Sequence, residues 1–250
     1  MKLIEKKISI IMCCKNNANY INGVVDSINK QNYKNLELII CLKNKINQKL
    51  PHLNNSNFKE KIFLQRGNGL YSAINQSIKK STGKIIFIHH PDNLIIDKRL
   101  FNKVNEVFVS KKIDLFYSNL YIVDSSNVNK ITRRWSSPIF KKKLLDFGWA
   151  PPHPTLFYSS TIAKKFKYNE RYKISSDYDL MIRVLRKINP KQIFRYNKFT
   201  IAMRDNGLSD HPKHIFLKTY EDYKILRNNK YRFPGIILLI KIIKKIKQLF

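Results

Sequence analysis

The sequence predicts an α/β fold in which a mostly parallel central sheet is flanked by helices. Short apolar segments typical of buried strands alternate with segments whose apolar residues recur at helical spacing. Strands joined by helices pair in parallel through right-handed crossovers, and such open sheets bind ligands at the carboxyl ends of their strands. With 250 residues, 43% of them hydrophobic, the chain has enough apolar material for a substantial core.

The first half of the chain shows this alternation most clearly. Gly83 is expected to end the second helix as a C-cap, and Pro91 stops the fourth strand because it has no N–H for central pairing. Asp92 is therefore expected at the ligand-binding edge of the sheet. The expected strands are Ile8–Cys13, Leu36–Leu42, Lys61–Leu64 and Lys84–Ile88, and the expected helices are Asn19–Lys30 and Gly69–Ser81.

The second half is less regular. Asp114–Asp124 is expected to be a strand with a hairpin partner beyond Ser125–Asn127, and Ser175–Asp179 opens a helix. A polar helix is expected over His211–Asn229, followed by a distinct tail from Phe233. These patterns predict one domain over residues 1–210 and a C-terminal helical extension over residues 211–250.

The charge of the chain requires an anionic neighbour. Its 48 Lys and Arg residues face 17 Asp and Glu, a formal net charge of +31, which suits nucleic acid, an anionic membrane or a phosphorylated substrate. The lysines are spread along the chain and are not gathered with aromatic residues, so nucleic acid is not an expected partner. No apolar run approaches the ~20 residues of a spanning helix, and no signal peptide is expected. Cys13, Cys14 and Cys41 have no metal-binding spacing and fit a reducing, cytoplasmic setting.

Four segments resemble, in order and spacing, motifs of the family 2 glycosyltransferases with a GT-A fold, especially the colanic-acid and capsule type. Ser27–Glu37 matches S-I-x-x-Q-x-Y-x-N-x-E, and Gly69–Ser77 matches G-I-Y-D-A-M-N-K-G. Phe87–Asp92 matches a strand ending F-L-N-x-x-D, and Tyr172–Leu180 matches the later acidic segment. The family's G-G-x-S turn has its counterpart at Asn206–Ser209. Each motif is weak alone, but four in register are specific.

The resemblance implies a glycosyltransferase of the hexosyltransferase type, which moves a sugar from a nucleotide-sugar donor to an acceptor, usually with inversion. Asp92 matches the position that holds Mn²⁺ or Mg²⁺ against the donor diphosphate, with oxygen ligands that suit a hard cation. Asp177 matches the base that deprotonates the acceptor hydroxyl, and Asp179 and His153 match acceptor-side positions. Tyr71 and Asn75 lie in the donor-side helix motif. UDP is favoured as the nucleotide.

Several family carboxylates are missing on the donor side. The positions that are usually acidic or polar are Leu42, Gly67, Ser72 and His89. One interpretation is a donor pocket rebuilt around the cations Lys15, Lys43 and Arg66. The alternative is a catalytically degenerate protein that binds sugars or acts as a scaffold.

Each candidate also has a plain structural interpretation. Asp177 and Asp179 are ordinary residues for the first turn of a helix, and Asp92 is an ordinary turn residue. His89 and His90 are either metal ligands or polar residues at the rim of the sheet. His153, between two prolines, is an acceptor-side residue only through the resemblance.

The tail from Pro234 to Phe250 predicts a basic amphipathic helix. At 100° per residue, Lys241, Lys244 and Lys245 cluster on one side, most isoleucines share the other, and Ile237 is out of place. Such a helix binds an anionic membrane interface, although a terminal helix docked on the protein's own core is the alternative. A peripheral position at the inner face of the cytoplasmic membrane suits the polyprenyl-diphosphate-linked or oligosaccharide acceptors that the resemblance implies for bacterial O-antigen, capsule or lipopolysaccharide synthesis.

Overall fold

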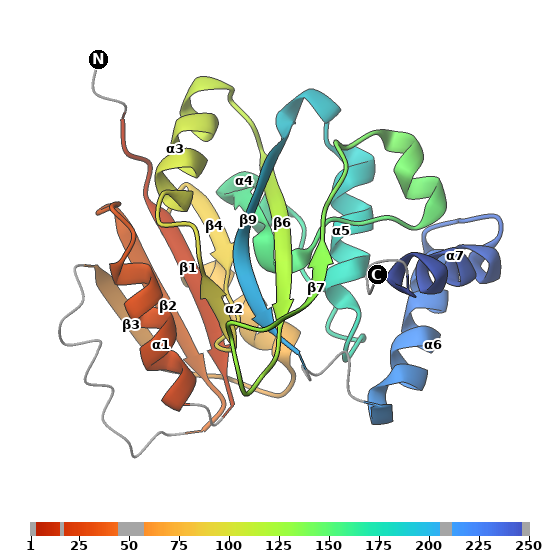
Figure 1. Ribbon diagram of the computed structural model, residues 1–250, viewed down its shortest axis with the longest axis horizontal. Helices are drawn as coiled ribbons and strands as arrows, with labels where there is room; N and C mark the ends of the chain where they lie inside the picture. Colours follow the sequence, from red (N-terminus) through yellow and green to blue (C-terminus); the bar gives the residue numbers. More distant parts are fainter. Residues whose placement is uncertain (1–3, 16–17, 45–57, 206–211, 247–250) are drawn as a thin grey trace.

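The structure of the protein is a computed structural model that describes residues 4–15, 18–44, 58–205 and 212–246 (Figure 1). The strands are β1 (Ile8–Cys14), β2 (Leu36–Leu42), β3 (Lys59–Leu64), β4 (Ile85–Ile88), β5 (Asn93–Ile95), β6 (Leu115–Val123), β7 (Ile131–Trp135), β8 (Phe157–Ser159) and β9 (Ile193–Arg204). The helices are α1 (Ala18–Asn29), α2 (Leu70–Lys80), α3 (Leu100–Ser110), α4 (Ser160–Lys165), α5 (Ser176–Lys187), α6 (Pro212–Asn228) and α7 (Pro234–Ile246). Short 3₁₀ turns, η1 (Lys142–Phe147), η2 (His153–Thr155) and η3 (Pro190–Gln192), join some of them.

The strands form one nine-stranded sheet in the order β3-β2-β1-β4-β8-β6-β9-β5, with β7 paired to β6. The pairs β3–β2, β2–β1, β1–β4 and β6–β9 are parallel, whereas β8 runs antiparallel to both of its neighbours. The predicted α/β fold with a mostly parallel, helix-flanked sheet is confirmed, and so is the hairpin of β6 with β7. The Asn206–Ser209 turn lies outside the described residues.

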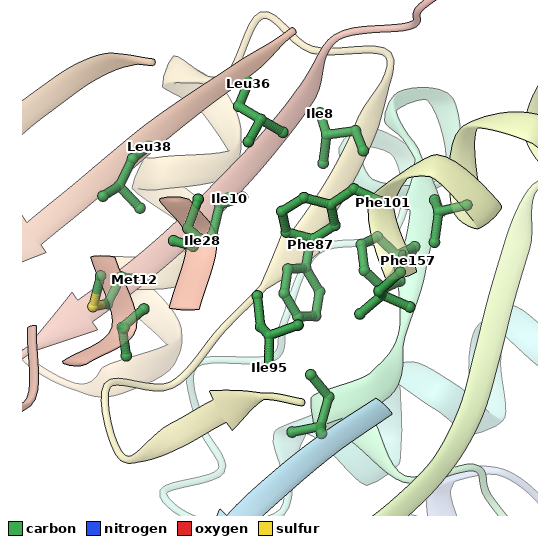
Figure 2. Packing of buried hydrophobic residues seen from close by; sticks show 14 of the residues in the cluster. Ile8, Ile10, Met12, Ile28, Leu36, Leu38, Phe87, Ile95, Phe101 and Phe157 are labelled. Carbon is green, nitrogen blue, oxygen red and sulfur yellow. The ribbon is translucent and has the colours of Figure 1, made fainter. Parts of the chain in front are cut away.

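Apolar side chains fill both faces of the sheet. On one face, α1 and α3 cover Ile10, Phe87 and Phe157 with residues such as Ile28 and Phe101 (Figure 2). On the other face, α2 and α5 pack Ile74, Ile78, Leu180 and Val184 against Ile11, Ile39 and Ile86. Neighbouring residues of β1 therefore point to opposite cores, as expected for a strand that is buried on both sides.

Glu37, the last residue of the first motif, ties the amino ends of β1, β2 and β4 together. Its buried carboxylate accepts hydrogen bonds from Ser9 Oγ (2.5 Å), Thr82 N (2.6 Å) and Gly83 N (3.1 Å), and Lys61 Nζ lies 3.3 Å away. Burial acts to raise its pKa, but the hydrogen bonds from Ser9 and Thr82 and the charge of Lys7 lower the pKa to about 2. This motif residue therefore has a structural role.

Gly83 is not the C-cap that the sequence predicted. Helix α2 ends at Lys80 and its cap is Ser81, so the helix stops before Gly83 is reached. A Cβ on Gly83 would lie 2.5 Å from Ser9 Oγ and 2.7 Å from the Lys7 carbonyl oxygen. Glycine is required here because the chain passes against β1, not because of a left-handed backbone.

The helices of the predicted extension pack on α5. Ile225 and Leu226 of α6 and Ile237 of α7 share a buried cluster with Tyr178 and Ile182. Figure 1 shows α6 and α7 beside α5, at the end of the molecule opposite α1. Residues 212–246 thus cover the helix that carries the predicted base, although a domain boundary near residue 210 stays a prediction. None of the described helices is long and apolar enough to cross a membrane.

Candidate active site

Four neighbouring parallel strands end at one edge of the sheet and bring the donor-side candidates to it. Lys15 follows β1, Lys43 follows β2, Arg66 lies just beyond β3, and Asp92 lies in the turn after β4. Backbone bonds join the strand ends, for example Lys43 N to the Cys14 carbonyl oxygen at 2.9 Å. The three cations are exposed and Asp92 is partly exposed. This edge is where open α/β sheets bind ligands.

The turn after β4 separates two adjacent histidines. His89 is fully buried beneath Phe87, and burial lowers its pKa to about 3, so it stays neutral. Of the two histidines, only His90 is partly exposed beside Asp92. The turn is tied to the end of β9 because Arg204 donates to the Asp92 carbonyl oxygen at 2.9 Å. His89 is therefore a core residue, neither a rim residue nor a candidate ligand.

The protein groups at this edge supply only part of a metal site. No three His, Cys, Asp or Glu side chains within the described parts of the chain are grouped as a metal centre would require. Asp92 and His90 offer an oxygen and a nitrogen, and a cation there would need diphosphate oxygens of the donor as its further ligands. Metal binding by Asp92 thus stays a prediction.

Asp177 lies in the first turn of α5 and is partly exposed. Burial raises its pKa, while the charges of Lys218 and His90 act in the opposite direction and that of Asp222 adds to the increase. His90 follows β4, and its charge affects Asp177, so the predicted base lies within electrostatic range of the turn that carries Asp92. The catalytic role of Asp177 stays a prediction.

His153, in η2, extends this cluster. Its Nε2 lies 2.7 Å from the Tyr168 hydroxyl, and its ring centre lies 5.8 Å from that of His90. Burial and the neighbouring charge of His90 lower its pKa to about 3, so His153 stays neutral. His90, which the sequence left between two interpretations, is thus electrostatically coupled to both His153 and Asp177. The acceptor-side role of His153 stays a prediction.

Tyr71 and Asn75, predicted to bind the donor, hold the segment that precedes α5. The Tyr71 hydroxyl donates to the Ile174 carbonyl oxygen, and its ring stacks on Tyr168 at 5.6 Å. Asn75 Nδ2 donates to the Tyr168 carbonyl oxygen and to Glu170 Oε1, each at 2.9 Å, and its Oδ1 accepts from Tyr168 N at 3.0 Å. Donor binding by either side chain stays a prediction.

Asp179 is separated from Asp177 by two positions of α5. It is 4% exposed, accepts from Arg183 Nε at 2.8 Å and lies 3.4 Å from Asn229 Nδ2. Its carboxylate therefore contacts the side of α5 that carries Arg183. Its acceptor-binding role remains a prediction.

Sequence reasoning missed three residues of α6. Glu221 accepts backbone N–H groups of the segment before α5, Lys218 affects the pKa of Asp177, and Asp222 binds Lys241 of α7 at 2.8 Å. Burial would raise the pKa of Asp222, but Lys241 and Lys218 lower it. The sequence offered one signal for these residues, because Glu221 and Asp222 are adjacent acids in a strongly basic chain.

Helix α7 docks with one side and exposes another. Ile237, out of place in the amphipathic pattern, is 5% exposed and faces Gly148, and the Lys241 ammonium lies 3.3 Å from the centre of the Tyr178 ring. The side that carries Lys241 therefore faces the protein. Among the side chains of α7 that the structure describes, Ile236, Leu239, Ile242 and Ile243 are apolar and exposed.

The fold is that of the GT-A glycosyltransferases. Among solved structures, Staphylococcus aureus TarS with UDP-GlcNAc has a TM-score of 0.69 at 16% identity, covering 88% of this chain and 64% of that one. The mannosyltransferase PcManGT of Pyrobaculum calidifontis, with GDP-Man and Mn²⁺, has a TM-score of 0.63 at 11% identity, covering 95% and 69%.

The sequence comparisons identify the family. Residues 9–171 match the model of Glycosyl transferase family 2, and the chain belongs to that family. An uncharacterized glycosyltransferase of Methanocaldococcus jannaschii is 28% identical over 94% of this chain and 84% of its own. The O-antigen biosynthesis glycosyltransferase WbnJ of Escherichia coli is 26% identical over 71% of each chain. The match to the family model ends before Asp177, so the role of Asp177 as the base stays a prediction.

Proposed function

We propose that this glycosyltransferase moves one sugar from a nucleotide-sugar donor at the carboxyl edge of β1–β4 to an acceptor hydroxyl that faces Asp177. The observation that carries the proposal is the position of Asp177 beside His90, at the strand end that also carries Asp92. A base must lie within reach of the acceptor proton, and the acceptor must lie against the donor sugar. The proposal requires the Asp177 carboxylate to meet both conditions when substrates occupy this edge.

The reaction is a single displacement. Asp177 takes the proton of the acceptor hydroxyl while its oxygen bonds to the anomeric carbon. The bond from that carbon to the diphosphate oxygen breaks, and the nucleoside diphosphate leaves with the electron pair. Attack opposite the leaving group inverts the anomeric carbon. Burial raises the pKa of Asp177, which makes it a stronger base than an exposed aspartate.

The leaving diphosphate needs positive charge, and the donor edge supplies it through Lys15, Lys43 and Arg66. A divalent cation on Asp92, when bound with the diphosphate, would add Lewis-acid neutralisation of the same charge. Structural neighbours crystallised with UDP-GlcNAc, with GDP-Man and Mn²⁺, or with UDP and Mg²⁺ support a nucleotide-sugar donor, and UDP is the nucleotide we favour.

The acceptor we propose is a polyprenyl-diphosphate-linked sugar or an oligosaccharide in bacterial surface-polysaccharide assembly, such as O-antigen, capsule or lipopolysaccharide. The similarity to WbnJ, named for O-antigen biosynthesis, supports this assignment. The exposed apolar side chains of α7 and the net charge of +31 support a peripheral position on an anionic membrane surface.

The test uses purified full-length protein with UDP- and GDP-sugars, each with Mn²⁺, with Mg²⁺ and with chelator. We expect nucleoside diphosphate release from one donor, faster when a polyprenyl-diphosphate-linked sugar is added, and loss of this rate in Asp177→Ala. Sugar or nucleotide binding without any release, together with an Asp177→Ala variant that still complements polysaccharide synthesis, would establish the degenerate binding protein instead. The replaced carboxylate positions Leu42, Gly67, Ser72 and His89 are the observation that favours this alternative.

A further inference from the structure

Glu221 is a buried carboxylate of α6 that faces the residues leading into α5. It is 5% exposed. Its Oε1 accepts from Lys173 N at 2.7 Å, and its Oε2 accepts from Ile174 N and Ser175 N, each at 2.9 Å. Three consecutive backbone N–H groups therefore converge on one side chain that lies 46 to 48 positions away in the sequence.

This arrangement lies just before the usual cap of a helix. The first N–H groups of a helix have no partners within it, and a Ser at the N-cap commonly binds one of them. Ser175 occupies the N-cap of α5, but its side chain makes no capping bond. Glu221 does not bind the first N–H groups of the helix; it binds the N–H of Ser175, the N-cap residue, and of the two residues before it. The segment is therefore held from another helix.

The same segment is held from its other side by α2. Tyr71 donates its hydroxyl to the Ile174 carbonyl oxygen, while the Ile174 N–H donates to Glu221. Both polar groups of one peptide residue are thus bound by side chains of different helices, three positions before Asp177. The backbone in front of the base is fixed in two directions.

We propose that Glu221 is a positioning residue that sets the location of Asp177 by binding the backbone N–H groups of Lys173–Ser175. The proposal rests on the proposed function of Asp177 as the base. Misplacing a catalytic group by about 1 Å costs on the order of 100-fold in rate, so a side chain that holds the adjacent backbone has catalytic consequences. The carboxylate of the neighbouring Asp222 binds Lys241 of α7 at 2.8 Å.

The test compares Glu221→Gln, which keeps the shape but opposes an NH₂ group to backbone donors, with Glu221→Asp, which keeps the charge. We expect Glu221→Gln to lower kcat about 10- to 100-fold, with donor KM changed less than about threefold. Glu221→Asp should recover part of kcat. Hydrogen exchange at residues 173–175 should accelerate in Glu221→Gln and stay slow in a matched control, Glu106→Gln, which removes a 47% exposed carboxylate of α3.

The outcomes separate this proposal from the proposed function. If Asp177→Asn loses activity but Glu221→Gln keeps wild-type kcat, or keeps slow exchange at residues 173–175, the positioning role is overturned. If Glu221→Gln instead accelerates exchange throughout the protein and lowers kcat only in proportion to the folded fraction, Glu221 is merely structural and the proposal also fails. A wild-type protein that transfers no sugar would remove the proposed function itself.

Discussion

The two sides of the active-site edge are built in opposite ways. The donor side carries exposed cations at the ends of β1, β2 and β3. The base side carries buried or half-buried acids with bound partners: Glu221 accepts backbone N–H groups of the segment before α5, and Asp222 binds Lys241 of α7. Under the proposed function, charge placement is tolerant where a mobile diphosphate would bind and strict where a proton would be taken, because only the second task needs a fixed atom.

The sharpest test of this contrast uses two acids of one helix turn. Asp177→Asn should lower kcat about 10²- to 10⁴-fold, the range for loss of a general base. Asp179→Asn should mainly lower Tm, because it removes the partner of Arg183 at 2.8 Å. Steady-state kinetics and thermal unfolding of both variants measure the two effects.

The pH dependence follows from the same residue. Burial raises the pKa of Asp177, so the carboxylate is protonated and inactive below that pKa. kcat/KM should therefore fall as the pH is lowered through it, and Asp177→Asn should abolish this limb. In the comparison of the two acids, equal losses of kcat in Asp177→Asn and Asp179→Asn would show that Asp179 belongs to the site as well, as the family resemblance implied.

The elements and site residues that could be predicted from the sequence are those marked by a pattern of neighbouring residues. Strands β1, β2 and β4 and helices α1, α2 and α5 were predicted because each is a continuous pattern of apolar residues. Strand β9 was missed, because Arg195 and Lys198 interrupt its alternation at the outer part of the sheet. Asp177 was predicted from a motif, but Glu221 was not, since no local spacing connects it to a backbone segment more than 40 residues earlier.

The next prediction concerns the free energy of unfolding. Glu37 contributes to it from the amino end of β2, the end opposite Lys43. The lowered pKa of about 2, against an ordinary value of 4.5, corresponds to about 3 kcal/mol of unfolding free energy. Because the folded-state pKa is depressed, this contribution is present above about pH 4.5 and is lost as the pH falls toward about 2.

Glu37→Gln should therefore lower the free energy of unfolding in urea by about 3 kcal/mol at pH 7 and by much less at pH 3. Glu106→Gln, at an exposed ion pair, should change it by less than about 1 kcal/mol at either pH. A Glu37→Gln variant as stable as wild type at pH 7 would contradict the structural role of this motif residue.

The third prediction tests whether the exposed cations meet the diphosphate. Lys15→Ala, Lys43→Ala and Arg66→Ala should each raise the donor KM about 3- to 10-fold, since charge-assisted contacts in a solvated site contribute about 1 kcal/mol. The effect should shrink at high salt. Lys187→Ala, which removes an exposed cation at the far end of α5, is the matched control. Unchanged donor KM in all three variants would exclude these cations from donor binding.

The smallest effect is expected from substitutions on the exposed side of α7. The other side of this helix, which carries Ile237 and Lys241, packs on α5 and α6. Leu239 and Ile243 are 58% and 46% exposed, and neither is needed for the contacts that Ile237 and Lys241 make. If this exposed side lies in a membrane interface, Leu239→Glu should reduce binding to vesicles containing anionic phosphatidylglycerol about fivefold, for roughly 1 kcal/mol of lost apolar burial.

Co-sedimentation with such vesicles measures this, and Ile96→Glu, at a 42% exposed isoleucine between β5 and α3, is the control. Equal binding by Leu239→Glu and wild type, or no binding by wild type, would remove the membrane from the proposal. Because Lys241 is bound to Asp222 and is not free for lipid, binding should depend more on the apolar side chains of α7 than on this cation. A variant that loses vesicle binding yet keeps kcat on a water-soluble acceptor would show that the exposed side of α7 binds lipid independently of its packing on α5 and α6.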